Sequence, residues 1–218
     1  MQMVNILKSL YERVEKLKLE GKKKNKINKA LNRLIEEYSN IDIDTNNEIY
    51  KALIKKGKDV LKSTSTADIE GYIRYCEAAI YDFKGDLKPL NYLFRAFLIT
   101  SILFMILAPQ YFGPILPLIF ILPIFLGIKG LKKRSATGLT LALSVLPMGL
   151  LTSVASIKNS ILALGEGNKF YTELAQFYKI SLSTAKGLFL AFFILSIVLA
   201  FTSIYTFVIG VKHNRMFV

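Results

Sequence analysis

The stretch YFGPILPLIFILPIFLGIKG (residues 111–130), followed by LKKRSA (131–136) and TGLTLALSVLPMGLLTSVASI (137–157), decides the fold of this chain. It contains two apolar runs of about 20 residues, and each run is long enough to cross the ~30 Å hydrocarbon core of a bilayer as a helix. A short basic turn separates the two runs. The sequence therefore predicts an integral membrane protein built around this hairpin.

Two further apolar segments lie on either side of the hairpin. We expect membrane spans at about 90–108, 112–128, 137–157 and 187–210. The connection between the last two spans carries apolar residues on one helical face at about 168–182. This pattern predicts a short amphipathic helix that either lies in the outer membrane interface or packs over the end of the spans.

The first 86 residues have the pattern of a soluble helical module. Apolar residues recur at spacings of four and three in three segments, which predicts helices with one apolar face each. These residues are Met3, Leu7, Leu10, Val14 and Leu17; Ile27, Leu31, Leu34, Tyr38 and Ile41; and Ile69, Ile73, Cys76, Ile80 and Phe83. A weaker segment between them has Ile49, Leu53, Val60 and Leu61 as its expected apolar face.

The short connections between these segments favour antiparallel neighbours. We therefore predict an all-α protein with two domains: a bundle of two helical hairpins at 1–86 and a four-span transmembrane domain at 87–218. A dimeric coiled coil through the first two apolar faces is the competing interpretation of the module.

Charge is distributed unevenly between the two predicted domains. Residues 91–218 contain eleven Lys and Arg but only two acidic residues, Glu166 and Glu173. Near the span ends, eight Lys and Arg lie on one side of the predicted topology and four on the other. Because positively charged loops favour the cytoplasm, we expect a multi-pass protein of the cell membrane with both termini in the cytoplasm. Basic residues that flank apolar spans also favour anionic lipids over nucleic acid as partners.

Hydroxyl residues and prolines in the second and third spans form the first candidate site. Thr140, Ser144, Thr152 and Ser156 recur at multiples of four, so we expect them to lie close to one helical face. Pro147 and Pro123 lack an N–H, and each leaves the carbonyl four residues earlier without its usual partner. One hypothesis is a polar solute path of the kind that broken helices line in transporters. The alternative is ordinary close packing of helices through small residues.

Four basic residues form the second candidate site. Arg95 lies five residues inside the first apolar run, and Lys132, Lys133 and Arg134 form the turn between the second and third spans. A guanidinium at this depth is expected either to extend to lipid phosphates or to face a groove open to the cytoplasm.

The sequence offers little for enzyme chemistry. The one histidine is His213, close to the end of the chain, and the single cysteine, Cys76, excludes an internal disulfide. No spacing typical of a metal site or a phosphate-binding loop is present. We therefore expect neither catalysis nor a cofactor.

Two functions remain open at this point. The first is a membrane scaffold or regulator whose helical module, at 1–86, binds a protein partner or a second copy of the chain. The second is a channel or carrier for a small neutral or cationic solute. Four spans with short loops enclose little volume, so such a path requires several subunits.

Overall fold

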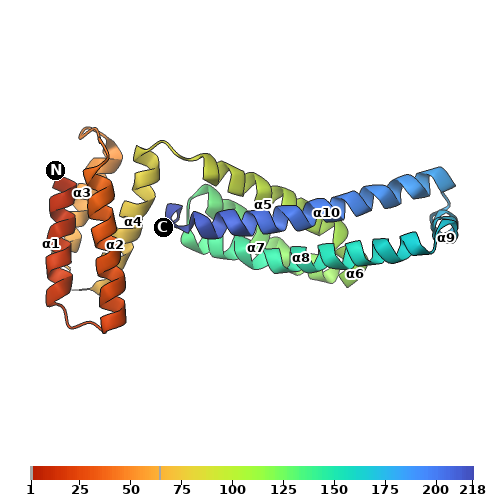
Figure 1. Ribbon diagram of the computed structural model, residues 1–218, viewed down its shortest axis with the longest axis horizontal. Helices are drawn as coiled ribbons and strands as arrows, with labels where there is room; N and C mark the ends of the chain where they lie inside the picture. The colour runs from red at the N-terminus through yellow and green to blue at the C-terminus, as the bar shows by residue number, and fades with distance from the viewer. Residues whose placement is uncertain (1, 64) are drawn as a thin grey trace. The chain divides into compact units, whose positions relative to one another are not determined.

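The computed structural model describes residues 2–63 and 65–218, and this part of the chain contains helices and turns but no strand. Its α-helices are α1 (Gln2–Lys16), α2 (Gly21–Ser39), α3 (Glu48–Val60), α4 (Thr66–Phe83), α5 (Lys88–Leu107), α6 (Pro109–Phe112), α7 (Ile115–Lys132), α8 (Ala136–Gly165), α9 (Asn168–Tyr178) and α10 (Leu182–Lys212) (Figure 1). Among the described residues, four helical stretches are long and apolar enough to cross a membrane: Lys88–Phe112, Ile115–Lys132, Ala136–Gly165 and Leu182–Lys212. The prediction of an all-α membrane protein with four apolar spans is confirmed.

The chain divides into two compact units. The first unit comprises residues 1–88 together with residues 215–218, and the second comprises residues 89–214. In the first unit, helices α1 and α2 form one hairpin and helices α3 and α4 form another, and α1 packs on α3 while α2 packs on α4. This arrangement buries the apolar faces of all four helices in one core.

The apolar faces expected for α1, α2 and α4 are buried in this core, except that their last residues, Leu17, Ile41 and Phe83, are only partly buried. Leu7, Leu10 and Leu34 are fully buried, as are Leu31 and Ile69. The expected face of α3 is wrong at its first position, because Ile49 is 41% exposed. Leu53 and Val60 are buried as expected, together with Tyr50, Ile54 and Gly57.

Tyr72 explains why Gly57 belongs to the buried face of α3. Tyr72 is fully buried, and its hydroxyl donates a hydrogen bond of 3.2 Å to the carbonyl oxygen of Leu53. A Cβ atom at Gly57 would collide with the Tyr72 hydroxyl and would lie 2.8 Å from Cγ2 of Ile6. The missing side chain therefore lets α3 approach the aromatic ring closely, although glycine costs helix stability elsewhere.

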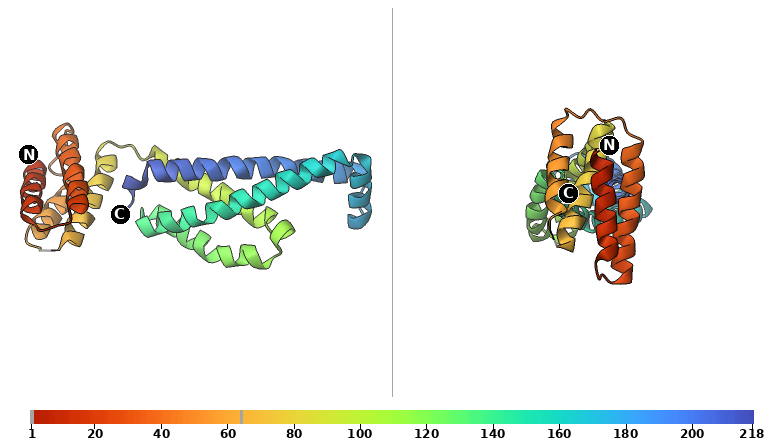
Figure 2. Two further views of the ribbon diagram at one scale, coloured as in Figure 1. Left: turned by 60° about the horizontal axis from the view of Figure 1, so that its bottom comes forward. Right: turned by 90° about the vertical axis from the view of Figure 1, so that its left-hand side faces the viewer.

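In the second unit, α8 is the central helix. It packs on α10 along much of its length and on α7 as the second arm of a hairpin. Figures 1 and 2 show α8 and α10 extending past the end of α6, with α9 lying across their far end. The unit is therefore a bundle at one end and a helix pair capped by α9 at the other.

The helices α8 and α10 are longer than the predicted spans 137–157 and 187–210. They contain 30 and 31 residues, which corresponds to about 45 Å each and exceeds the hydrocarbon thickness. Hydropathy falls after Ile157, but the helix continues because Ser160 and Ala163 are still buried. The predicted amphipathic helix at about 168–182 corresponds to the shorter α9, which ends at Lys179 with a left-handed backbone (φ 53°).

The hairpin of α7 and α8 is held together by glycines. A Cβ atom on either Gly130 or Gly138 would collide with the backbone of the other. Gly127 lies in the same way against the backbone of Ala142, where a Cβ atom would be 3.1 Å from the Cα. These contacts allow the two backbones to approach more closely than larger side chains would permit.

A pair of glycine substitutions tests the packing of the first unit. We expect Gly57→Ala to lower its stability by about 1–3 kcal/mol, since the new methyl group overpacks the site beside Tyr72. Gly71→Ala is the matched control, because a Cβ atom at that helical position meets nothing within 4 Å. It should raise stability by about 0.5–1 kcal/mol. The rate at which the buried Cys76 thiol is labelled in increasing urea reports both changes, and equal effects would contradict this packing.

Alkaline pH should unfold the first unit, because burial raises the pKa values of Cys76, Tyr38 and Tyr72. The unfolded thiol ionises above about pH 8.5 and the unfolded phenols above about pH 10, while the folded groups stay protonated. Each buried group therefore contributes its full stabilisation below the pKa of its unfolded form. Above that pKa, the free energy of unfolding falls by about 1.4 kcal/mol per pH unit for each group.

Thermal unfolding followed by circular dichroism between pH 7 and 10.5 measures this loss. The Cys76→Ala variant should lose stability only above about pH 10, where the tyrosines begin to ionise. A midpoint that does not change with pH in the original chain would contradict the buried environment of the three groups.

Candidate functional site

The interface between α8 and α10 carries small residues at intervals of seven. On α8 these are Gly149 and Ser156, and on α10 they are Ser196, Ser203 and Gly210; all five are buried. The two sets meet in antiparallel register, since Ser156 is hydrogen-bonded to Ser196 and a Cβ atom at Gly149 would lie 3.0 Å from the Ser203 hydroxyl. We call this interface the hydroxyl seam. A seven-residue repeat keeps such small residues facing one partner helix along its length.

A hydrogen-bonded relay of hydroxyl groups occupies one end of the hydroxyl seam. The Tyr111 hydroxyl donates to the Ser156 oxygen over 2.9 Å, and the Ser156 and Ser196 hydroxyls are hydrogen-bonded to each other. Ser196 in turn donates to the carbonyl oxygen of Phe192 over 2.7 Å. Each hydroxyl can thus donate once and accept once, and the relay ties α6, α8 and α10 together.

Two other buried hydroxyls differ from those in the relay. Thr100 on α5 and Ser203 on α10 are fully buried, and neither side-chain oxygen has a hydrogen-bond partner within the described residues. Neighbouring hydroxyls such as that of Thr152 bond to a carbonyl of their own helix instead. Gly149 lies next to both residues, with Cγ2 of Thr100 3.6 Å from the position of a Cβ atom. A buried hydroxyl without a partner costs about 1–3 kcal/mol, so this is the least satisfied polar part of the unit.

The predicted hydroxyl residues of α8 do not share one face. Thr152 and Ser156 are buried in the hydroxyl seam, whereas Thr140 and Ser144 are exposed on the outside of the helix. At 100° per residue, a separation of 16 residues turns the helix by about 160° beyond complete turns, so Thr140 and Ser156 point almost oppositely. The two exposed hydroxyls donate to carbonyl oxygens of their own helix, those of Ala136 and Leu141.

The two prolines lie inside continuous helices and away from the hydroxyl seam. Pro147 is exposed on α8, and Pro123 is half-buried on α7. Pro147 and the hydroxyls of Thr152 and Ser156 lie on different faces of α8. The carbonyl that Pro147 leaves without a partner therefore does not line one path with these hydroxyls within a single chain.

The predicted basic residues lie on the surface of the second unit. Arg95, Lys132 and Lys133 are exposed, and Arg134 is half-buried in the turn between α7 and α8, with a left-handed backbone (φ 54°). The Lys132 ammonium lies 5.3 Å from the centre of the Phe94 ring, which places it beside α5. This position suits contact with lipid headgroups at the helix ends.

The chemistry available inside the second unit is limited. Its buried polar side chains are those of Ser and Thr, and no buried charged side chain occurs in its described residues. The described chain also contains no group of three His, Cys, Asp or Glu residues that could hold a metal ion. Hydroxyl oxygens can pair helices or bind a small neutral molecule or a cation, but they do not supply an acid or a base near neutral pH.

Sequence reasoning did not identify Thr100, Tyr111, Ser196 and Ser203 as members of the site. The spacing of Ser196, Ser203 and Gly210 was visible in the sequence and is the signal that could have indicated α10. Nothing in the sequence indicated that Tyr111 would reach Ser156. Comparison of the chain with protein-family models, with curated proteins and with solved structures found no match.

Two serine substitutions on α8 distinguish the hydroxyl seam from the exposed face. We expect Ser156→Ala to lower the free energy of unfolding in detergent by about 1–2 kcal/mol, because it leaves the Tyr111 hydroxyl without its acceptor and removes one of the two hydrogen bonds of Ser196. Ser144→Ala deletes an exposed hydroxyl and should change stability by less than about 0.5 kcal/mol.

Combining each serine variant with Tyr111→Phe gives a double-mutant cycle. The coupling to Ser156 should be on the order of 0.6 kcal/mol, an average value for hydrogen bonds in membranes, and the coupling to Ser144 should be zero. Equal couplings would contradict the relay.

Proposed function

We propose that this protein is an integral membrane scaffold or regulatory protein whose helical module, the first unit, binds a protein partner. The observation that carries the proposal is the outer surface of α3. The module has a complete core of its own, yet a row of exposed lysines follows the outer surface of α3. The membrane helices contribute packing and hydroxyl groups but no buried charge among the described residues, which fits anchoring better than chemistry.

The exposed surface of α3 carries a row of lysines, and Ile49 lies about 160° around the helix from Lys51. Lys51, Lys55 and Lys58 are exposed at spacings of four and three, so they follow one face of the helix. Ile49 is 41% exposed on α3 and Tyr75 is 42% exposed on α4. The Lys56 ammonium lies 3.1 Å from the centre of the Tyr75 ring, so the aromatic side chain adjoins α3. An acidic protein segment is the partner that complements this row of lysines.

The orientation that we propose places this module in the cytoplasm. The excess of Lys and Arg on the side of the termini supports it. That both termini lie on one side is supported separately, because residues 215–218 belong to the same compact unit as residues 1–88. Two ends in one unit require an even number of crossings, which four spans satisfy.

The alternative function is an oligomeric channel or carrier for a small neutral or cationic solute. Thr100 and Ser203 favour it, because two fully buried hydroxyls without partners leave hydrogen-bonding capacity unused inside the membrane unit. From the sequence, this path was expected to be lined by the prolines and the four hydroxyls of α8. Thr100, Gly149 and Ser203 are better candidates for lining a solute path, since they lie together.

Charge reversal on α3 tests the scaffold proposal. We expect Lys51→Glu/Lys55→Glu to reduce capture of the partner from membranes of the native cell by at least about ten-fold, because complementary charge is replaced by like charge. The matched control is Lys22→Glu/Lys26→Glu, which reverses two exposed lysines with the same spacing on α2. Crosslinking from a photoreactive side chain at Lys58, in the same row, followed by mass spectrometry, measures the capture.

Equal capture by the two charge-reversed proteins would contradict a site on α3. Solute flux in proteoliposomes that depends on Ser203, measured with Ser203→Ala, would favour the carrier instead. The two outcomes are distinguishable, since one concerns the soluble module and the other concerns a buried hydroxyl.

A further inference from the structure

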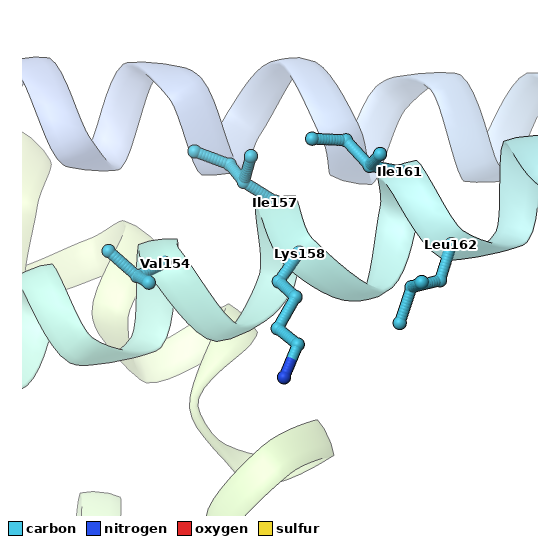
Figure 3. A pocket seen from close by; sticks show the side chains of 5 residues that line it. All are labelled: Val154, Ile157, Lys158, Ile161 and Leu162. Carbon is cyan, nitrogen blue, oxygen red and sulfur yellow. The ribbon is translucent and has the colours of Figure 1, made fainter.

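A groove on the far part of α8 combines an apolar wall with one charged group. Its volume is about 340 Å³, and it is lined by Val154, Ile157, Lys158, Ile161 and Leu162. Figure 3 shows Val154, Lys158 and Leu162 along one row of the helix surface, with Ile157 and Ile161 in the neighbouring row. Such rows form ridges with a channel between them, into which an extended chain of similar width can pack.

The position of this groove along the bilayer normal is estimated from the part of α8 that carries Ser156. The hydrogen bond from Tyr111 to Ser156 places α6, where the chain turns between α5 and α7, beside this turn of α8. From Ala136 to Ser156 the helix rises about 30 Å, which equals the thickness of the hydrocarbon core. With Ala136 at one boundary of the hydrocarbon core, Lys158 lies at the other, and Val154 and Ile157 lie on its lipid-tail side.

The ammonium group of Lys158 has no ion-pair partner among the described residues. Residues 91–218 contain two carboxylates, and that of Glu173 lies 4.0 Å from the Lys169 ammonium on α9. The other, Glu166, follows Lys158 by eight residues, or about 12 Å along the helix axis. A counter-charge for Lys158 must therefore come from outside this part of the chain.

We propose that this groove is a binding site for an anionic phospholipid of the leaflet on the α9 side. The phosphate pairs with the Lys158 ammonium, and one acyl chain lies along Val154 and Ile157 toward the middle of the bilayer. This inference goes beyond the scaffold function and does not depend on it. The lipid covers a surface of α8 on which no other described element of the chain packs.

A second copy of the chain fits this groove less well than a lipid does. The far ends of α8 and α10, with α9, carry Lys158, Lys169, Lys179 and Lys186 against two acidic residues. Two copies in contact there would bring like charges together, which disfavours association. A lipid supplies both the negative charge and the apolar chain that the groove lacks.

Lipid titration of the full-length protein tests the site. The purified protein in detergent is titrated with dioleoyl phosphatidylglycerol, and native mass spectrometry counts the bound lipids. We expect Lys158→Gln to weaken the tightest lipid-binding step about five-fold, the effect of one Lys at an anionic surface. The matched control is Lys169→Gln, which removes the same charge from α9 outside the groove and should leave that step unchanged.

A second variant addresses the apolar wall. Val154→Ser keeps every charge, and we expect it to weaken binding of the dioleoyl lipid while leaving binding of a dihexanoyl phosphatidylglycerol unchanged. Both variants should keep the thermal midpoint of the original protein, since Val154 and Lys158 are exposed.

Three outcomes would overturn the proposal. Equal lipid affinity of the Lys158→Gln and Lys169→Gln proteins would show that the charge at the groove is irrelevant. Competition by millimolar inorganic phosphate would show a site for a free anion rather than a lipid. Protein dimers that Val154→Ser dissociates would show that a second copy covers this face.

Discussion

The close approach of neighbouring helices is the constraint on which the second unit depends. Lipid tails are as apolar as leucine, so membrane helices gain little from hydrophobic burial against each other. They associate through close packing and hydrogen bonds instead. At Gly130 and Gly138 the backbones of α7 and α8 lie so near that neither position has room for a Cβ atom. The hydroxyl seam extends the same principle to α10, with Gly149 and Ser203 in contact distance.

The first unit is stabilised differently, although its helices follow a similar spacing. Its interior is built from Leu, Ile and aromatic residues, and its stability comes mainly from removing these side chains from water. The hydroxyls of its buried Tyr38 and Tyr72 are paired with the backbone: Tyr38 donates to the carbonyl oxygen of Cys76 over 2.9 Å, and Tyr72 to that of Leu53 over 3.2 Å. One chain therefore uses hydrophobic burial in water and small-residue contact in lipid.

This difference explains which features the sequence could predict. In the first unit, spacing identified buried residues such as Leu10 and Leu34, because water makes apolar side chains turn inward. In the second unit, hydropathy located the spans but not their packed faces, because apolar residues face lipid and protein alike. Ser144 and Ser156 look equivalent in the sequence, yet only Ser156 is buried. The predicted spans were shorter than α8 and α10, because hydropathy reports contact with lipid. The two helices continue beyond the apolar stretch through contact with each other.

The scaffold and carrier hypotheses make opposite demands on the hydroxyl seam. A scaffold requires a closed seam, and the relay from Tyr111 through Ser156 to Ser196 closes it at one end with every hydroxyl satisfied. A carrier requires a seam that opens, and the unpaired hydroxyls of Thr100 and Ser203 make opening less costly near Gly149. Each hydrogen bond in the relay contributes only about 0.6 kcal/mol, so the close packing of the small residues must supply most of the free energy that keeps the seam closed. Whether the seam can open therefore depends on packing at Gly149 more than on any single hydroxyl.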